Sequence, residues 1–263
     1  MTDPLLLRTD SGGIARLVLN APERLNALSD AMLAALGAEL ARIGADRSIR
    51  VVIIAGTGRA FCAGHDLREM QAARQAPDKG AAAFKDLFDR CAAVMQAVTT
   101  LPQPVIAEVH AIAAAAGCQL AASCDMVVAA DTARFGANGV NIGLFCSTPM
   151  VALTRKVPAS VAFEMLTTGA FLTATRAAEV GLVNRVTTPD ALTDETMALA
   201  RTLAGKLGAA VALGKRAFYD QIGLPLADAY ALTGAVMVEN MGWRDTDEGI
   251  SAFLEKRAPD WQL

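Results

Sequence analysis

The stretch of residues 110–130, HAIAAAAGCQLAASCDMVVAA, constrains the fold most, because it is almost entirely small and apolar. Gln119 and Asp125 interrupt it, so it lacks the run of about 20 apolar residues that a membrane-spanning helix needs. Strand-like runs lie at residues 104–109 and at its own end, residues 126–130. The pattern therefore predicts a strand, a tight turn, a short helix and a second strand.

Residues 113–117, AAAAG, carry almost no side chain. Such a segment lets a neighbouring backbone or a ligand approach the main chain closely. The first turn of the predicted helix also has unpaired N–H groups with partial positive charge, which suit an oxyanion. The same composition is also typical of a buried, tightly packed alanine-rich helix, so both interpretations stay open on this stretch alone.

A second stretch, residues 58–67 (GRAFCAGHDL), follows the apolar strand-like run at 51–55 and again combines a strand exit with small residues. Together the two stretches resemble the signature segments of the enoyl-CoA hydratase/isomerase (crotonase) superfamily, in which each segment gives one backbone N–H to a hole for the acyl-CoA thioester oxygen. The resemblance runs from residues 22–28 (PERLNAL) to residues 248–257 (EGISAFLEKR). It is closest to the enoyl-CoA hydratase domain-containing proteins.

The resemblance implies an α/β fold, a crotonase-like spiral of ββα units followed by a C-terminal helical trimerisation region. We expect residues 1–190 to form the spiral core with the acyl-CoA site and residues 191–263 to form the C-terminal helical region. The family implies a homotrimer or a dimer of trimers. Apolar spacing predicts strands at 14–19 and 51–55 and helices at 84–98, 173–180, 190–204, 209–221 and 226–241. Ser29 stands at the N-cap position of a further helix, before apolar residues at helical spacing: Met32, Leu33, Leu36, Leu40 and Ile43.

Bulk properties narrow the class of protein. The chain has 263 residues, 53% of them hydrophobic, so it can bury a large core. A net charge of −3, without a basic cluster, argues against nucleic acid as a partner. The first ten residues, MTDPLLLRTD, show neither a signal-peptide nor a transit-peptide pattern. We therefore expect a cytoplasmic protein of a bacterial type that binds no membrane.

The cysteines form no CxxC pair and lie mostly within apolar runs, which predicts buried thiols. Neither His65 nor His110 stands at a recognisable metal-ligand spacing from them. We expect no metal, and no cofactor other than the CoA that is part of the substrate. The five cysteines are Cys62, Cys91, Cys118, Cys124 and Cys146.

By motif position, the donors of the oxyanion hole are the backbone N–H groups of His65 and Ala116. The family usually has glycine where this chain has Ala116; alanine is acceptable there if its backbone is helical and does not require φ > 0. Each donor of such a hole stabilises the developing charge by about 3–4 kcal/mol.

The two catalytic glutamates of the family's hydratases are replaced here, by Gln119 and Gly139. An amide cannot exchange a proton near neutral pH, and glycine has no side chain. The resemblance thus implies hydration of a 2-enoyl-CoA in fatty acid metabolism, while these two positions predict that this activity is weak or altered.

Other groups could supply different chemistry. The His65 ring either takes part or merely packs; the GHD form also occurs in relatives resembling malonyl-type and methylmalonyl-type acyl-CoA decarboxylases, which makes decarboxylation an alternative. Cys146 and Ser147 lack an obvious local base, so a nucleophilic role competes with packing and turn formation. A non-catalytic acyl-CoA-binding protein is the third reading.

The resemblance also places the contacts to CoA. One set is the backbone around Leu25, Ala27 and Leu28, and a second set is Ala63, Asp66 and Leu67. Phe253 and Lys256, near the C-terminus, often reach a neighbouring subunit's ligand in the family, although they also fit an ordinary amphipathic helix end. His110 stands where the family usually has asparagine, and we expect it to make a structural hydrogen bond.

Overall fold

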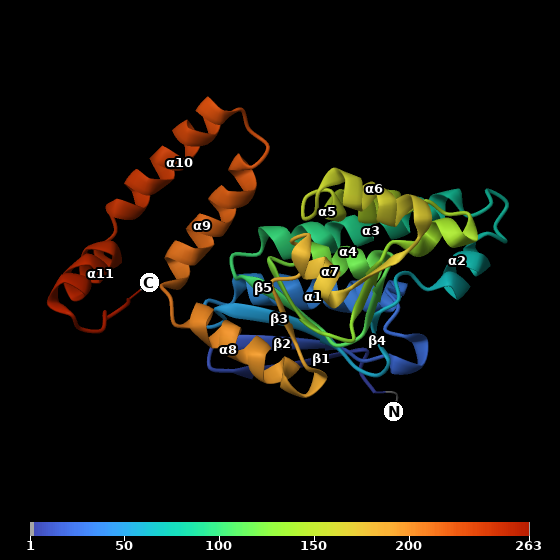
Figure 1. The fold of residues 1–263 in the computed structure, drawn as a ribbon, viewed down its shortest axis with the longest axis horizontal. Helices are drawn as coiled ribbons and strands as arrows, with labels where there is room; N and C mark the ends of the chain where they lie inside the picture. Colours follow the sequence, from blue (N-terminus) through green and yellow to red (C-terminus); the bar gives the residue numbers. More distant parts are fainter. Residues whose placement is uncertain (1–2, 263) are drawn as a thin grey trace.

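Two sheets form the body of the protein in a computed structural model that describes residues 3–262 (Figure 1). The larger sheet has the strand order β1-β2-β3-β5-β7-β10. Neighbouring strands in it are parallel, except that β1 and β2 are antiparallel. Its strands are β1 (Leu6–Ser11), β2 (Ile14–Leu19), β3 (Val51–Gly56), β5 (Val105–Val109), β7 (Met126–Ala130) and β10 (Arg185–Thr187). The smaller sheet has the order β4-β6-β8-β9, formed by β4 (Ala60–Cys62), β6 (Ile112–Ala114), β8 (Arg134–Gly136) and β9 (Phe171–Thr173).

Successive strand pairs build a spiral. Strands β3 and β4, then β5 and β6, then β7 and β8 each give one strand to each sheet, and a helix follows each pair. The helices are α2 (Leu67–Ala73) with α3 (Ala81–Thr100), then α4 (Ala116–Ser123), then α5 (Ser147–Leu153). The predicted spiral of ββα units is therefore confirmed. Sequence reasoning missed β6, because it expected a tight turn where the chain makes three residues of strand.

Local signals explain the ends and faces of the elements. Helix α1 (Asp30–Ala45) begins where Ser29 caps it, its hydroxyl accepting from the N–H of Met32 at 3.2 Å. The buried face of α1 is the predicted apolar stripe, which packs on α3. Strands β3 and β5 are buried along nearly their whole length, as expected for parallel strands covered on both faces.

Helix α8 (Leu192–Ala204) lies beyond residue 190, the division expected from the sequence, yet it packs against the larger sheet through Leu192, Leu199 and Ala200. The elements that extend away from the core are α9 (Gly208–Gln221), α10 (Leu226–Met241) and α11 (Arg244–Glu255) (Figure 1). We call these three helices the arm. The other elements are α6 (Ala159–Thr168), α7 (Ala174–Glu179) and the 3-10 turns η1 (Pro22–Arg24), η2 (Asn138–Ile142) and η3 (Pro189–Ala191).

The cysteines are all free and buried, as the sequence predicted. No group of three or more metal-ligating side chains gathers anywhere in residues 3–262. Within the same range no single helix is long and apolar enough to cross a bilayer. One pair of helices, Pro189–Ala204 and Gly208–Gln221, meets both criteria only when taken together, and the two are bent by 102° at the break between them.

Candidate functional site

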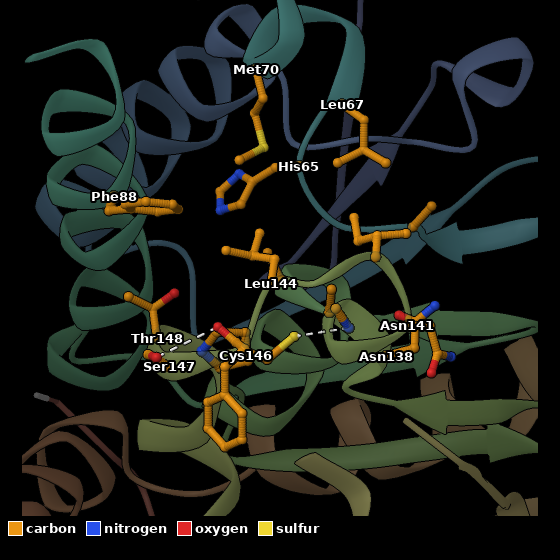
Figure 2. A pocket seen from close by; sticks show the side chains of 17 residues that line it. His65, Leu67, Met70, Phe88, Asn138, Asn141, Leu144, Cys146, Ser147 and Thr148 are labelled. Carbon is orange, nitrogen blue, oxygen red and sulfur yellow. Dashed lines mark hydrogen bonds between the residues drawn. The ribbon is translucent and has the colours of Figure 1, made fainter. Parts of the chain in front are cut away.

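A cavity of about 320 Å³ opens where the first turn of α4 meets the loop after β4 and the segment from η2 to α5 (Figure 2). It brings together six of the predicted residues: Ala63, His65, Leu67, Ala116, Gly139 and Cys146. Most of the remaining wall is apolar. None of the seventeen lining residues in the described chain carries a carboxylate; the lining includes Leu67, Met70, Phe88, Ile142, Leu144 and Phe145.

Two backbone N–H groups are available on this wall. Ala116 is the first residue of α4, so its N–H has no partner within the helix. His65 forms an isolated parallel bridge with Leu28, but there the N–H of Leu28 donates to the carbonyl of Gly64 at 2.7 Å. Among the described turns and loops, no backbone hydrogen bond is donated by His65 or Ala116. Two unpaired donors on one cavity are what an oxyanion hole requires.

Alanine is tolerated at position 116 because that residue is helical, but the preceding residue is strained. Ala115 has φ 47° and ψ −118°, a left-handed conformation that usually requires glycine. Gly117 cannot be replaced so easily, because a Cβ there would lie 2.1 Å from the carbonyl oxygen of Cys62. The strained residue is therefore Ala115, one residue before Ala116, where the sequence had suggested that alanine in place of glycine could be unfavourable.

The His65 ring lies on the cavity wall, and Figure 2 shows it among Met70, Phe88 and Leu144. Its centroid is 5.7 Å from that of Phe88 in an edge-on arrangement. Nδ1 lies 3.4 Å from the carbonyl oxygen of Leu28, and Nε2 is buried without a hydrogen-bond partner. Burial lowers the pKa of His65, although the Leu28 carbonyl and the charge of Asp30 oppose this.

Gln119 is not brought to this cavity. It lines a second cavity of about 760 Å³ between α3, α4, α5 and α9, where its Oε1 is buried without a partner. Gly139 does line the first cavity, but a Cβ there would lie 2.3 Å from the carbonyl oxygen of Leu144 and 2.9 Å from Sγ of Cys146. The backbone around Gly139 therefore leaves no space for a glutamate side chain.

Cys146 and Ser147 lack the partner that a nucleophile needs. Sγ of Cys146 accepts from the N–H of Gly139 at 3.4 Å, and burial raises the pKa of this thiol. The hydroxyl of Ser147 lies 3.5 Å from the carbonyl oxygen of Phe145. No hydrogen bond within residues 3–262 joins either side chain to a histidine. Their observed contacts are those of packing and turn formation.

The positions expected to contact CoA divide into four groups, of which three lie near the cavity. Ala63 and Leu67 line the cavity. The carbonyl of Leu25 accepts from the N–H of Ala63 at 3.0 Å, so the loop containing Leu25, Ala27 and Leu28 lies against the cavity segment. Asp66 caps α2, accepting from the N–H of Arg68 at 2.9 Å, and pairs with Arg24 at 3.2 Å.

Phe253 and Lys256, the last predicted contacts, lie at the end of the arm and not at the cavity of the same chain. Phe253 is 82% exposed. A contact between these residues and a ligand in this cavity therefore needs a second subunit.

Two polar side chains fix the loops around the site. His110 makes the predicted structural hydrogen bond, with Nε2 2.8 Å from the carbonyl oxygen of Gly58. Sequence reasoning missed Asn26, which is fully buried at φ 52° and donates to the carbonyls of Thr57 and Ala60 at 2.8 and 2.9 Å. Asparagine's tolerance of left-handed backbone was the available signal.

Comparison with known proteins gives one consistent family. The family model for enoyl-CoA hydratase/isomerase matches residues 9–263. The enoyl-CoA hydratase domain-containing protein 3, mitochondrial, of Xenopus laevis is 45% identical over 258 residues, which are 98% of this chain and 86% of that protein.

Solved structures agree with the fold. An enoyl-CoA hydratase of Mycobacterium smegmatis superposes with a TM-score of 0.95 at 52% identity, covering 99% of this chain and 100% of that one. The human enoyl-CoA hydratase domain-containing protein 3 superposes with a TM-score of 0.93 at 42% identity, covering 98% and 100%.

The relatives contradict the cytoplasmic location expected from the first ten residues. Several of them, from frog, human and zebrafish, carry the word mitochondrial in their names. The expectation was wrong because it rested on ten residues at one end of the chain, and the fold that this chain shares with its relatives does not determine where the protein is located.

Proposed function

Because this chain belongs to the enoyl-CoA hydratase/isomerase family, we propose that its cavity binds an acyl-CoA thioester and stabilises the enolate, or another oxyanion, that forms on the thioester oxygen. The donors are the backbone N–H groups of His65 and Ala116. The observation that carries the proposal is the presence of both unpaired donors on the wall of one largely apolar cavity. A low-polarity wall strengthens such donors, because little water competes with them.

Hydration of a 2-enoyl-CoA by two carboxylates does not fit this cavity. None of its described lining residues is acidic, Gln119 faces another cavity, and Gly139 has no space for a longer side chain. A general acid or base contributes about 10²–10⁴-fold to a rate. We expect hydration of crotonyl-CoA to be weak or absent.

Decarboxylation of a malonyl-type CoA is the second candidate, because loss of CO₂ generates an enolate that needs the hole but no carboxylate. A protein that only binds acyl-CoA is the third. Turnover of a panel of enoyl-CoA, malonyl-CoA and plain acyl-CoA thioesters separates these three outcomes.

The hole is tested with acetoacetyl-CoA, whose enolate absorbs ultraviolet light when it forms on the protein. We expect the wild type to bind it as the enolate. Ala116→Pro removes one donor N–H at the first helical position and should weaken enolate stabilisation on the order of 10²–10³-fold.

Ala159→Pro is the matched control, because Ala159 is the exposed first residue of α6 and lies outside the cavity. Its spectrum and affinity should equal those of the wild type, and thermal melting checks that both variants are folded. If the wild type binds no CoA thioester below millimolar concentration, or if folded Ala116→Pro forms the enolate as well as the control, the proposal fails.

A further inference from the structure

The tautomer of His65 follows from its one hydrogen bond. Nδ1 faces the carbonyl oxygen of Leu28 at 3.4 Å, and a carbonyl oxygen can only accept. Nδ1 therefore carries the proton of the neutral ring, and Nε2 carries a lone pair. This assignment opposes a role in which Nε2 donates a proton to a departing carboxylate, as a decarboxylase would use it.

The lone pair of Nε2 has no partner in the described chain, although the atom is buried. A buried acceptor without a donor is unfavourable, because it has lost its hydrogen bonds to water. The neighbouring ring of Phe88 and the side chains of Met70 and Leu144 offer no donor. Such a nitrogen is available to a group of the ligand.

His65 is also the one base of this cavity in the described chain. Of the lining residues, only His65 and Cys146 can titrate in the range of neutral pH, and burial raises the pKa of the Cys146 thiol, which keeps it protonated. The cavity thus combines two donors for an oxyanion with one nitrogen that can receive a proton.

From this arrangement we infer that Nε2 of His65 is the general base that removes a proton from the α-carbon of the bound acyl-CoA. The inference rests on the function proposed above. The backbone N–H of the same residue holds the thioester oxygen, so the ring extends from a Cα that already lies beside the carbonyl group. His65 is then a catalytic residue through both its main chain and its side chain.

The step balances without a further reactant. The C–H bond at the α-carbon breaks, and the proton goes to Nε2. The electron pair of that bond forms the carbon–carbon double bond of the enolate, while the carbonyl pair moves to the oxygen held by His65 and Ala116. The imidazolium then exchanges this proton for a deuteron of the solvent, and transfer of that deuteron to the same carbon, as the enolate reverts to the thioester, completes the exchange reaction.

The charges around His65 are few. Asp30, at the start of α1, is the carboxylate whose charge favours the imidazolium, and it is paired with Arg90 of α3 at 2.7 Å. On the chain that follows His65, Asp66 is paired with Arg24. The burial that lowers the pKa of His65 keeps the base unprotonated at neutral pH, so the exchange rate should rise with pH and level off below the usual histidine range.

The test is exchange of the α-protons of butyryl-CoA in D₂O, followed by mass spectrometry, with affinity measured by calorimetry. We expect the wild type to incorporate deuterium. His65→Gln keeps the backbone donor but cannot take up a proton, and should lower the exchange rate about 10²–10⁴-fold at unchanged affinity. Lys206→Gln, at an exposed position outside the cavity, is the control and should exchange like the wild type.

Added imidazole should restore part of the exchange in His65→Gly, which a purely structural role of His65 would not predict. The pH dependence of the exchange rate of the wild type is a second test of a titrating base and needs no substitution. If the wild type binds butyryl-CoA but incorporates no deuterium, or if His65→Gln exchanges at the wild-type rate, this inference is wrong while the binding function stands. If no thioester binds, both are wrong.

Discussion

At the scale of single residues, the conformation of Ala115 predicts a stabilising substitution. A non-glycine residue in such a left-handed conformation costs about 1–3 kcal/mol, whereas glycine adopts it without that strain. After the extra chain entropy of glycine is subtracted, we expect Ala115→Gly to raise the free energy of unfolding by about 1 kcal/mol. Urea denaturation at a fixed protein concentration measures it.

The neighbouring substitution supplies the control. Ala116 is helical, so Ala116→Gly should lower the free energy of unfolding by up to about 1 kcal/mol. Equal changes of the same sign in the two variants would show that the left-handed backbone of Ala115 is not the cause.

The residue scale also shows how far the sequence alone leads to the site. The resemblance to the family predicted that His65 and Ala116 share one site, and both residues line one cavity. The motifs did not reveal that Gln119 faces a second cavity or that Gly139 is closed in by Leu144. Those facts depend on how α4, α5 and the loop between η2 and α5 pack, and packing between distant segments leaves no local pattern.

At the scale of elements, strong local signals located most helices and the central strands of the larger sheet, which are β2, β3, β5 and β7. Ser29 marks the start of α1, and Thr173 caps α7 by accepting from the N–H of Arg176. Strand β6 was missed because it has only three residues, and alanine in two of them gives no strand preference. It forms because β4 and β8 pair with it on either side.

A buried ion pair joins the arm to the core. Nζ of Lys215, on α9, donates to Oδ2 of Asp125 at 2.7 Å and to the carbonyls of Val98 and Gln103 at 3.0 Å. Tyr219 donates to the other oxygen of Asp125 at 2.8 Å. Asp125 interrupts the apolar stretch of residues 110–130 at the point where it anchors this helix.

We therefore expect Asp125→Ala to destabilise the protein by about 3–5 kcal/mol, because it leaves Lys215 buried without its counter-ion. A double-mutant cycle with Lys215→Met should give a coupling energy of about 1 kcal/mol or more in denaturant unfolding. Lys206→Met removes an exposed lysine nearby and should change stability by less than about 0.5 kcal/mol. Additive effects of Asp125→Ala and Lys215→Met would contradict the anchoring role.

At the scale of the whole molecule, the arm presents an apolar surface that nothing in the described chain covers. Helix α10 has no buried residue, yet it carries Leu226, Tyr230 and Val238, each more than 70% exposed. Apolar spacing predicted α9 and α10, and the resemblance implied a trimerisation region, but the spacing alone did not show that the arm projects from the core. An apolar stripe that faces another subunit has the same spacing as one that faces the chain's own core. Soluble monomers rarely leave such large apolar patches exposed.

The homotrimer, or dimer of trimers, that the family implies would cover this surface, and sedimentation velocity at micromolar concentration tests it. We expect the wild type to sediment as a trimer or hexamer and Val238→Glu to shift towards monomer, because a charge would be buried in the interface. Glu239→Gln changes an exposed polar neighbour and should leave the assembly intact. If the arm also carries Phe253 and Lys256 to a ligand in another subunit, Val238→Glu should weaken acyl-CoA binding in parallel with dissociation. A wild type that sediments as a monomer would contradict the prediction, and a dissociated variant with wild-type affinity would remove Phe253 and Lys256 from the binding site.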